Sequence, residues 1–315
     1  MSDKDQTQDP QIEIDELRAM TRTTARATCQ GLEDVLYKIH PVLDHGFVRV
    51  VDYMGDDASI VQAARVSYGK GTKSVRGDEG LIRYLMRHHH STPFEMCEIK
   101  LHVKLPIFVA RQWIRHRTAN VNEYSARYSV LDKEFYIPSP ENLAAQSVQN
   151  NQGRGEVLEG EEAQWVLDTL RADGDASYAR YEELLNETQS GEQLVEGRSG
   201  LARELARMML PLNTYTQWYW KIDLGNLMHF LALRADPHAQ YEIRAYADAI
   251  IQILHAWVPF AAQAFEDYRM GAFEMSAQML ACLQRMLSGE EVDQVSSGLS
   301  KREWAEFTAA IGKTA

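Results

Sequence analysis

The chain has 315 residues, of which 45% are hydrophobic and 25% charged, and its formal net charge is -12. This length allows one large domain or two modest ones, and the composition is that of an ordinary soluble globular protein. The acidity disfavours a nucleic-acid duplex as partner, because the phosphate backbone rewards broad basic surfaces. No apolar run approaches the length of a bilayer crossing and residues 1–10 do not resemble a signal peptide, so we expect a cytoplasmic protein.

The first part of the chain alternates between polar and periodic segments. Residues 1–45 are polar and mixed, and we expect a variable extension with one helix. The β-branched residues at 47–53 predict a strand, and the apolar spacing at 57–67 predicts a helix. The Gly/Lys-rich stretch at 69–77 predicts a loop. It is not a Walker-type phosphate cradle, since no strand leads into the required pattern.

A helix that Asp78 can cap follows this loop, with an apolar face made of Leu81, Ile82, Leu85 and Met86. It ends in three adjacent histidines, His88, His89 and His90. Neighbours in sequence point in different directions on a helix and seldom share one ion, so we predict no metal site here.

Residues 94–105 show the period-two alternation of a half-buried antiparallel strand. Pro106 ends this strand and can open the next helix, which places Gln112 and Arg115 on one face. The Gly-rich segment within 146–163 predicts an exposed insertion. Two helices are expected to follow, around residues 165–170 and 178–185.

The last part of the chain predicts further helices and one more strand. A helix over 199–210 should stop at Pro211, and the aromatic stretch 214–222 predicts a strand. Apolar stripes then indicate two core helices, and a helical tail is expected over 270–315. The pattern as a whole predicts a mixed α+β fold with an antiparallel sheet flanked by helices.

Arg115-His116-Arg117, followed by Asn120, Asn122, Glu123, Ser125 and Arg127, is the most informative stretch of the sequence. It concentrates cations in an acidic protein. Guanidinium groups present planar forks that suit phosphate or carboxylate oxygens, and neutral Ser and Asn side chains complete an anion's shell. An anionic ligand is therefore favoured. The alternative is a solvated cluster of cations at a helix end, where they complement the helix dipole.

The pattern R-H-R-x7-S-x-R in this stretch resembles the signature of the flavin-dependent thymidylate synthases. Further blocks that resemble the family in order are His90–Glu95, Pro106–Trp113, Glu134–Pro138, Ala206–Asn213 and Leu233–Gln240. Together they extend from about residue 46 to residue 268. The resemblance implies a single catalytic domain over 46–315 and a homotetramer whose active sites lie between subunits.

The resemblance implies reductive methylation of dUMP to dTMP. In this family 5,10-methylenetetrahydrofolate supplies the carbon unit, and FAD, reduced by NADPH, supplies the hydride. Such an enzyme must either add a nucleophile to the uracil ring or raise the electron density of the ring. The three cysteines, Cys29, Cys97 and Cys282, lack an adjacent base or metal-type spacing. They favour a reducing compartment and the second route.

Arg234 matches the family position that is credited with activating the uracil, and the alternative for it is a surface ion pair with Asp236. The positions implied for FAD are Thr92, Glu95, Arg115, His116, Arg117, Glu123, Asp223, Leu224, Gly225 and His229. Those implied for dUMP are Gln112, Trp113, Ile114, Arg115, Glu123, Tyr124, Ser125, Ala126, Arg127, Arg207 and Arg234. His90 is implied on the folate side.

The chain departs from the family pattern at three places. Asp223-Leu224-Gly225 stands where some members have Asn-x-Arg, His229 where an Asn can stand, and Ala126 where a Gly is found. Two alternative functions are a flavin- or nucleotide-binding sensor without catalysis, and a metal-dependent hydrolase that uses His88, His89, His90 and His116. The presence of both flavin-side and uracil-side blocks disfavours the sensor, and the absence of H-x-x-x-H spacing disfavours the hydrolase.

Overall fold

The computed structural model describes residues 10–66, 78–148 and 153–312. The chain divides into two compact units, Met1–Ala264 and Phe265–Ala315. Ser67 and the loop predicted at 69–77 lie outside the described residues. Within the described part of the chain, no helix combines the length and the apolar character that a membrane crossing requires.

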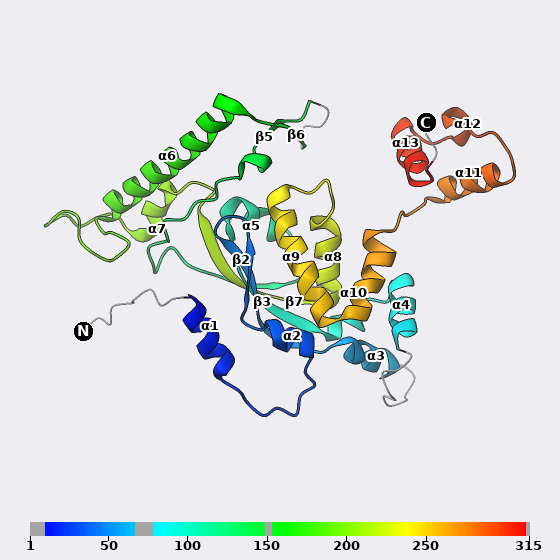
Figure 1. Cartoon of the computed structure of the whole chain (residues 1–315), viewed down its shortest axis with the longest axis horizontal. Coiled ribbons are helices and arrows are strands. Elements are labelled where there is room, and N and C mark those ends of the chain that lie inside the picture. Colours follow the sequence, from blue (N-terminus) through cyan, green and yellow to red (C-terminus); the bar gives the residue numbers. More distant parts are fainter. Residues whose placement is uncertain (1–9, 67–77, 149–152, 313–315) are drawn as a thin grey trace. The chain divides into compact units, whose positions relative to one another are not determined.

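The first unit is built around a five-stranded sheet with the order β1-β2-β3-β7-β4, in which every pairing is antiparallel (Figure 1). The strands are β1 (Ile39–Val42), β2 (Gly46–Met54), β3 (Glu98–Pro106), β4 (Asn120–Glu123) and β7 (Tyr215–Asp223). The predicted antiparallel sheet is thereby confirmed, as are the strands predicted at 47–53 and 214–222. Strand β4 was not predicted.

The strand predicted from residue 94 begins later than expected, at Glu98. Residues Phe94–Met96 form the short 3₁₀ helix η1, which the hydrogen bond from the Cys97 amide to the Phe94 carbonyl closes at 3.1 Å. Phe94 and Cys97 are both buried although they are three residues apart. This spacing suits a turn, because residues on one face of a strand are separated by even numbers.

Three helices pack against the sheet: α5 (Ile107–Trp113), α8 (Leu224–Arg234) and α9 (Tyr241–Trp257). Helices α8 and α9 confirm the predicted core helices. An aromatic cluster fills the space between helices and sheet, where the ring of Trp113 lies 4.8 Å from that of Phe230 and 5.1 Å from that of Trp220. Such large buried side chains contribute a major share of the hydrophobic stabilisation of a core. They also fix the end of α5, from which the R-H-R motif continues.

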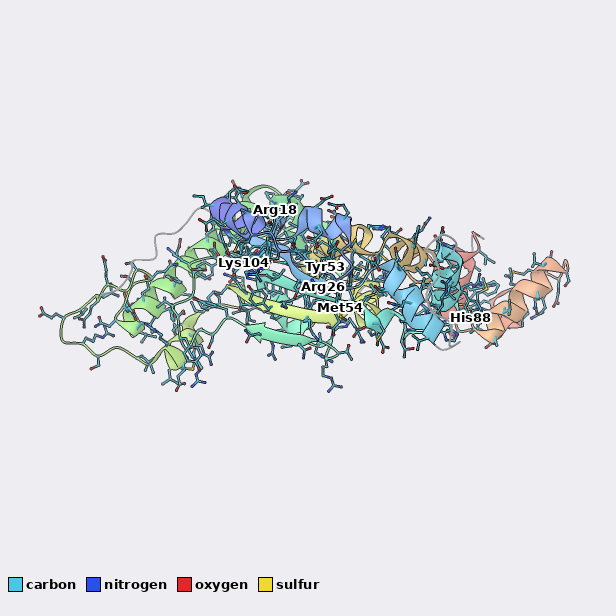
Figure 2. All side chains as sticks on the ribbon, turned by 90° about the horizontal axis from the view of Figure 1, so that it is seen from below. Arg18, Arg26, Tyr53, Met54, His88 and Lys104 are labelled. Atoms are coloured by element: carbon cyan, nitrogen blue, oxygen red, sulfur yellow. The ribbon has the colours of Figure 1, made fainter. Side chains whose placement is uncertain are left out.

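The residues before Gly46 contribute more than the single predicted helix. They form α1 (Pro10–Ala19), α2 (Gln30–Val35) and β1, and Leu32 is fully buried. The Cys29 amide donates to the Tyr53 hydroxyl at 2.8 Å, and Arg26 lies 3.8 Å from Asp52; Arg26 and Tyr53 are labelled in Figure 2. This segment therefore completes the edge of the sheet.

Helices α3 (Asp57–Val66) and α4 (Glu79–Arg87) follow, and α10 (Pro259–Phe265) comes after α9. Helices α3 and α4 confirm the helices predicted at 57–67 and after Asp78. The expected side-chain cap by Asp78 is wrong, because its carboxylate pairs with Arg65 at 2.5 Å and makes no capping hydrogen bond. Asp78 is buried, and a buried carboxylate requires a neighbouring cation, which explains why it pairs with Arg65 instead of capping the helix.

The two helices predicted after the insertion are one helix, α6 (Gly160–Leu185), with 26 residues. Gly174 lies in its middle, where a Cβ atom would come within 3.1 Å of the Phe135 ring. The small residue permits close packing without interrupting the helix. Trp165, near the start of this helix, is 67% exposed.

Before the insertion predicted at 146–163 lie η2 (Pro140–Asn142) and β5 (Ala144–Gln146), and β5 pairs with β6 (Arg154–Val157) inside it. The helix predicted over 199–210 begins only at Arg203 and consists of α7 (Arg203–Ala206) and η3 (Arg207–Met209). Gly200 has a φ of +72°, a left-handed conformation that a helix cannot include.

The second unit has its own small core. It contains the π-helical turn η4 (Glu266–Met270) and the helices α11 (Ala277–Leu287), α12 (Gln294–Ser297) and α13 (Lys301–Ala310). Ser300 and Glu303 form a capping box at the start of α13. The hydrophobic core of this unit consists of Met279, Cys282, Val292, Leu299 and Phe307. The predicted helical tail at 270–315 corresponds to most of this unit.

Candidate active site

Arg234, the last residue of α8, lies beside the R-H-R motif. Its Nε atom donates to Nε2 of His116 at 3.1 Å, and its Nη2 atom donates to the main-chain oxygen of Gln112 at 3.4 Å. A guanidinium group has no acceptor atom, so His116 must accept through an unprotonated nitrogen. The pKa of His116 is correspondingly lowered to about 4, by burial first, then by the charges of Arg234 and His229.

The alternative of a surface pair between Arg234 and Asp236 is wrong. Asp236 instead accepts from His238, whose Nδ1 atom lies 2.9 Å from the carboxylate. Arg234 is half-buried, and burial, followed by the neighbouring charge of Arg115, lowers its pKa. The guanidinium is thus held among groups that do not neutralise it, which suits an anionic or anion-forming ligand.

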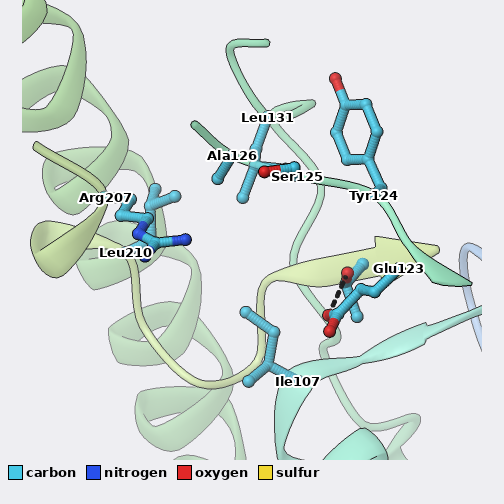
Figure 3. A pocket seen from close by; sticks show the side chains of 9 residues that line it. Ile107, Glu123, Tyr124, Ser125, Ala126, Leu131, Arg207 and Leu210 are labelled. Atoms are coloured by element: carbon cyan, nitrogen blue, oxygen red, sulfur yellow. Dashed lines mark hydrogen bonds between the residues drawn. The ribbon is translucent and has the colours of Figure 1, made fainter. Parts of the chain in front are cut away.

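The second half of the signature leads into a cavity of about 300 Å³ (Figure 3). Strand β4 pairs with the edge of β7, and Tyr124 continues this pairing by donating its amide to the Gln217 carbonyl at 2.8 Å. Pairing with β7 therefore positions residues 123–126 of the signature in the wall of the cavity. The lining consists of Ile107, Glu123, Tyr124, Ser125, Ala126, Leu131, Arg207, Leu210 and Thr216.

Polar groups of the cavity come from three separate elements. Glu123 on β4 accepts a hydrogen bond from the Thr216 hydroxyl on β7 at 2.8 Å, drawn as a dashed line in Figure 3. Arg207 on η3 brings a cation from the opposite wall. Sequence reasoning missed Thr216 and the apolar members Ile107, Leu131 and Leu210, because only the sheet register and the chain's return after α6 bring them to this cavity.

Arg127 does not line this cavity. It is exposed and pairs with Glu204 at 3.2 Å, and both side chains are about half exposed. The Arg127 amide donates to the Ser125 hydroxyl at 3.3 Å, which holds the turn that follows β4. An ion pair so exposed to solvent contributes little stability, so Glu204 can be displaced by a stronger anionic ligand of Arg127.

The candidate flavin-side residues lie where η1 meets the start of α8. The Leu224 amide donates to the Cys97 carbonyl at 2.8 Å, and a Cβ atom on Gly225 would lie 3.3 Å from Cγ of Glu95. The glycine at 225, a departure from the family pattern, therefore permits this close contact. Asp223 caps α8 by accepting from the Asn226 amide at 2.8 Å. This bond gives the carboxylate a structural role.

His229 connects this region to Arg234. It lies one turn after Gly225 on α8, and its ring centroid is 5.9 Å from that of His116. Thr92 and His90 are both exposed near η1, and the rings of His90 and Tyr84 are 6.0 Å apart. Of the candidate flavin positions, Glu95, Gly225, His229 and His116 thus meet along α8.

Two candidate positions have side chains that belong to the core. Trp113 and Leu224 are 0% exposed. Any ligand contact there would involve the main chain, and a side-chain contact is excluded in this conformation. Ile114, by contrast, is 45% exposed, and Ala126 is buried at the wall of the cavity.

The residues present fit an anionic dinucleotide such as FAD. Arg115 and Arg117 are exposed and form no ion pair with a described residue, so both can meet phosphate oxygens. His116 is a neutral ring that can pack on or bond to an uncharged heterocycle. In the described ranges, no group of three His, Cys, Asp or Glu side chains is arranged to hold a metal ion.

Each of the three thiols donates to a main-chain carbonyl. Cys97 is fully buried, and burial, followed by the charges of Asp56 and Asp57, raises the pKa of its thiol to about 12. Cys29 donates its Sγ atom to the Trp257 carbonyl at 3.2 Å, and Cys282 lies in the core of the second unit. A thiol held in its neutral form is a poor nucleophile, so the route without a cysteine nucleophile remains favoured.

Comparison with known proteins assigns the family. Residues 49–260 match the family described as thymidylate synthase complementing protein. The chain is 67% identical to the flavin-dependent thymidylate synthase of Ruegeria pomeroyi over 301 residues, which covers 96% of this chain and 97% of the relative. It is 63% identical to the enzyme of the same name from Gluconobacter oxydans, with 97% and 98% covered. The chain therefore belongs to the flavin-dependent thymidylate synthase family.

A solved structure supports the same fold. The UMP/dUMP methylase PolB from Streptomyces cacaoi, bound with 5-Br UMP, has a TM-score of 0.63 and 32% sequence identity. The similarity covers 73% of this chain and 97% of the methylase. Because these relatives are named as enzymes, they support the synthase over the non-catalytic sensor.

Proposed function

We propose that this protein is a flavin-dependent thymidylate synthase that converts dUMP into dTMP. In this proposal 5,10-methylenetetrahydrofolate is the carbon donor, tetrahydrofolate is released, and NADPH is the reductant. Bound FAD supplies the hydride that completes the methyl group. The observation that carries the proposal is the half-buried guanidinium of Arg234, oriented by His116 and Gln112 beside the family's signature.

Arg234 is the proposed catalytic residue. Uracil becomes nucleophilic at C5 when negative charge develops on N3, and a fixed guanidinium next to that nitrogen stabilises this charge. Two of the five N–H donors of Arg234 are used by His116 and Gln112, so others remain for the base. Because His116 is neutral, it orients the cation without adding a second charge.

The cavity beyond β4 is the proposed nucleotide site. Arg207, Ser125 and the amides around them offer donors to a phosphate, and Arg127 can join them by leaving Glu204. Ser125 hydrogen-bonds the nucleotide in this proposal and does not act as a nucleophile, since its hydroxyl accepts from the Arg127 amide and donates to no base among the described residues. Further proposed dUMP contacts are Gln112, Ile114, Arg115, Glu123, Tyr124 and Arg234, with Trp113 and Ala126 contributing main chain.

The proposed flavin site follows the face of α8 and the R-H-R motif. Arg115 and Arg117 would meet the phosphates, while His116 and His229 would lie near uncharged rings. Thr92, Glu95, Glu123 and the turn Asp223-Leu224-Gly225 complete the proposed set, and His90 is proposed on the folate side. We further propose a homotetramer with active sites between subunits, which agrees with the exposure of Arg115, Arg117 and Tyr124.

The test begins with the visible absorbance spectrum of the purified protein. A flavin spectrum that bleaches with NADPH and returns after addition of dUMP and methylenetetrahydrofolate, with dTMP formed, is the expected result. Absence of dTMP from a protein that holds flavin would contradict the proposal. Sedimentation measurements would test the tetramer separately.

A further inference from the structure

A buried carboxylate outside the proposed ligand contacts lies at the start of α9. Glu242 is 2% exposed and accepts three hydrogen bonds. Its Oε1 atom accepts from the Tyr136 hydroxyl at 2.9 Å and from Arg154 of β6, and its Oε2 atom accepts from the side-chain amide of Gln240 at 2.8 Å. Burying a carboxylate is costly, but these donors satisfy it fully.

The bond to Glu242 fixes the direction of the Gln240 amide. A carboxylate paired with an arginine only accepts hydrogen bonds, so the nitrogen of the amide must face it. The amide oxygen, Oε1, then points the other way. It accepts from the side-chain Nε2 of Gln112.

The direction of the Gln112 amide follows from the same reasoning. Its nitrogen faces the oxygen of Gln240, which leaves its own oxygen free to accept from a ligand. The main-chain oxygen of Gln112 meanwhile accepts from Arg234. A glutamine without such a partner presents oxygen or nitrogen with similar ease, because rotation of the amide exchanges them.

We propose that Glu242 is a positioning residue: through Gln240 it fixes the Gln112 amide so that an oxygen acceptor faces an N–H or O–H donor of the bound nucleotide. This inference rests on the proposed function, in which Gln112 contacts dUMP. The nucleotide has two donors of this kind, the N3–H of uracil and the 3′-hydroxyl of deoxyribose. The 3′-hydroxyl agrees better with the proposed role of Arg234, because an acceptor oxygen that faces N3 would oppose negative charge on that nitrogen. Glu242 itself does not contact the nucleotide.

Glu242→Gln tests whether Glu242 sets the donor-to-acceptor direction of the hydrogen bonds from Gln112 to Gln240 and from Gln240 to residue 242. The new amide keeps its oxygen toward Arg154 and Tyr136 and places its nitrogen toward Gln240. Gln240 must then turn its oxygen to this nitrogen and its own nitrogen to Gln112, which reverses Gln112 as well. A donor then faces the donor of the nucleotide. The affinity of the flavin-loaded protein for dUMP, measured by titration calorimetry, should fall on the order of tenfold.

A second variant should restore the original direction. In Gln240→Glu combined with Glu242→Gln, the carboxylate at 240 accepts from both neighbours, and Gln112 again presents its oxygen. The net charge is unchanged, and position 240 is exposed enough to hydrate the charge. The matched control is Tyr136→Phe, which removes a donor to the other oxygen of Glu242. It should leave dUMP affinity near that of the wild type.

The results separate positioning from simple stabilisation. Folded Glu242→Gln protein with wild-type dUMP affinity would overturn the inference, and so would a folded double variant that remains as weak as the single one. If Glu242→Gln does not fold, Gln240→Met provides a second test, because it removes both side-chain hydrogen bonds of the exposed residue 240. Weakened dUMP binding by this variant supports the inference, and unchanged binding refutes it. Failure of the wild type to bind dUMP would instead refute the proposed function.

A parallel titration with 2′,3′-dideoxyuridine monophosphate identifies the donor. If the 3′-hydroxyl is the partner of Gln112, Glu242→Gln should cost this analogue no further affinity. If N3–H is the partner, the analogue should lose as much affinity as dUMP does. A loss with dUMP is required in both cases.

Discussion

Nε2 of His116 lies 3.1 Å from Nε of Arg234, although the first side chain can carry a positive charge and the second always does. The contact is favourable only while the imidazole is neutral and accepts the hydrogen bond. Burial and the charges of Arg234 and His229 keep the pKa of His116 near 4, so this condition holds at neutral pH. The central histidine of the R-H-R motif, which follows α5, thus orients a cation at the end of α8.

Replacement of Arg234 by lysine should separate charge from geometry. Lysine keeps the positive charge but cannot bond His116 and the Gln112 carbonyl while presenting a planar fork to uracil. We expect retained flavin and a fall in kcat for dTMP formation on the order of tenfold to a hundredfold, from the loss of one or two charge-assisted bonds. Arg111→Lys, on the exposed side of α5, is the control. Wild-type turnover in Arg234→Lys would remove Arg234 from the site.

A pH-dependent stability is expected from His102. Its pKa is lowered to about 4, by burial first and then by Arg49, which donates to its Nδ1 atom at 2.8 Å. The unfolded chain binds a proton at this residue below its usual pKa of 6.5, whereas the folded chain does so only near 4. Its contribution is therefore complete above pH 6.5 and is lost as the pH falls from 6.5 to 4.

This loss can be measured as a fall in the urea midpoint of the wild type. Unfolding would be followed by tryptophan fluorescence at several pH values between about 7.5 and about 5. In His102→Gln the decline toward low pH should be smaller, because the variant has no group to protonate there. An equal or steeper decline in the variant would show that His102 does not take up the proton on unfolding.

Periodicity predicted the sheet and its covering helices well. Residues of β3 alternate strictly and α8 and α9 carry broad apolar stripes, so local pattern and tertiary burial agree. Helix α6 was predicted as two pieces because Gly174 and its neighbours weaken the stripe. The reason that the helix is continuous is visible only in the structure, where Gly174 packs against Phe135, 39 positions earlier in the sequence.

The candidate site was predicted only in part for a similar reason. The signature identified Arg115, His116 and the cavity residues after Glu123 as a group. The link from Gln112 to Gln240 joins residues 128 positions apart, and no pattern of residue types reveals such a bond. The same holds for Glu242, whose burial depends on Arg154 from the inserted hairpin.

Removal of all three thiols tests the route without a cysteine nucleophile. Cys29→Ser, Cys97→Ala and Cys282→Ala together should leave dTMP formation largely intact, because none of the candidate site residues is a cysteine and Cys97 is held neutral by burial. The protein should be somewhat less stable, since two of the three side chains are buried, by about 1 kcal/mol for each buried site. A folded, flavin-loaded triple variant without turnover would contradict this route.

We expect Arg127 to bind the nucleotide and Arg117 to bind the flavin, so that replacing each arginine weakens a different ligand. Arg127 pairs with Glu204 at an exposed position, and dUMP phosphate should displace this carboxylate, because the phosphate carries more charge and more acceptor oxygens. Arg127→Ala should then keep its flavin and bind dUMP about ten- to a hundredfold more weakly, as expected for a lost charge-assisted contact. Arg117→Ala should lose flavin during purification.

Glu204→Gln is the matched variant for this prediction. It removes the competing carboxylate, so dUMP affinity should rise or stay equal, and the fall caused by Arg127→Ala should persist in the double variant. Calorimetric titration with dUMP and the ratio of flavin to protein absorbance measure the two effects independently. Normal dUMP binding by Arg127→Ala would show that Arg127 serves only to pair with Glu204, and would leave Arg207 as the cation that meets the phosphate in the cavity.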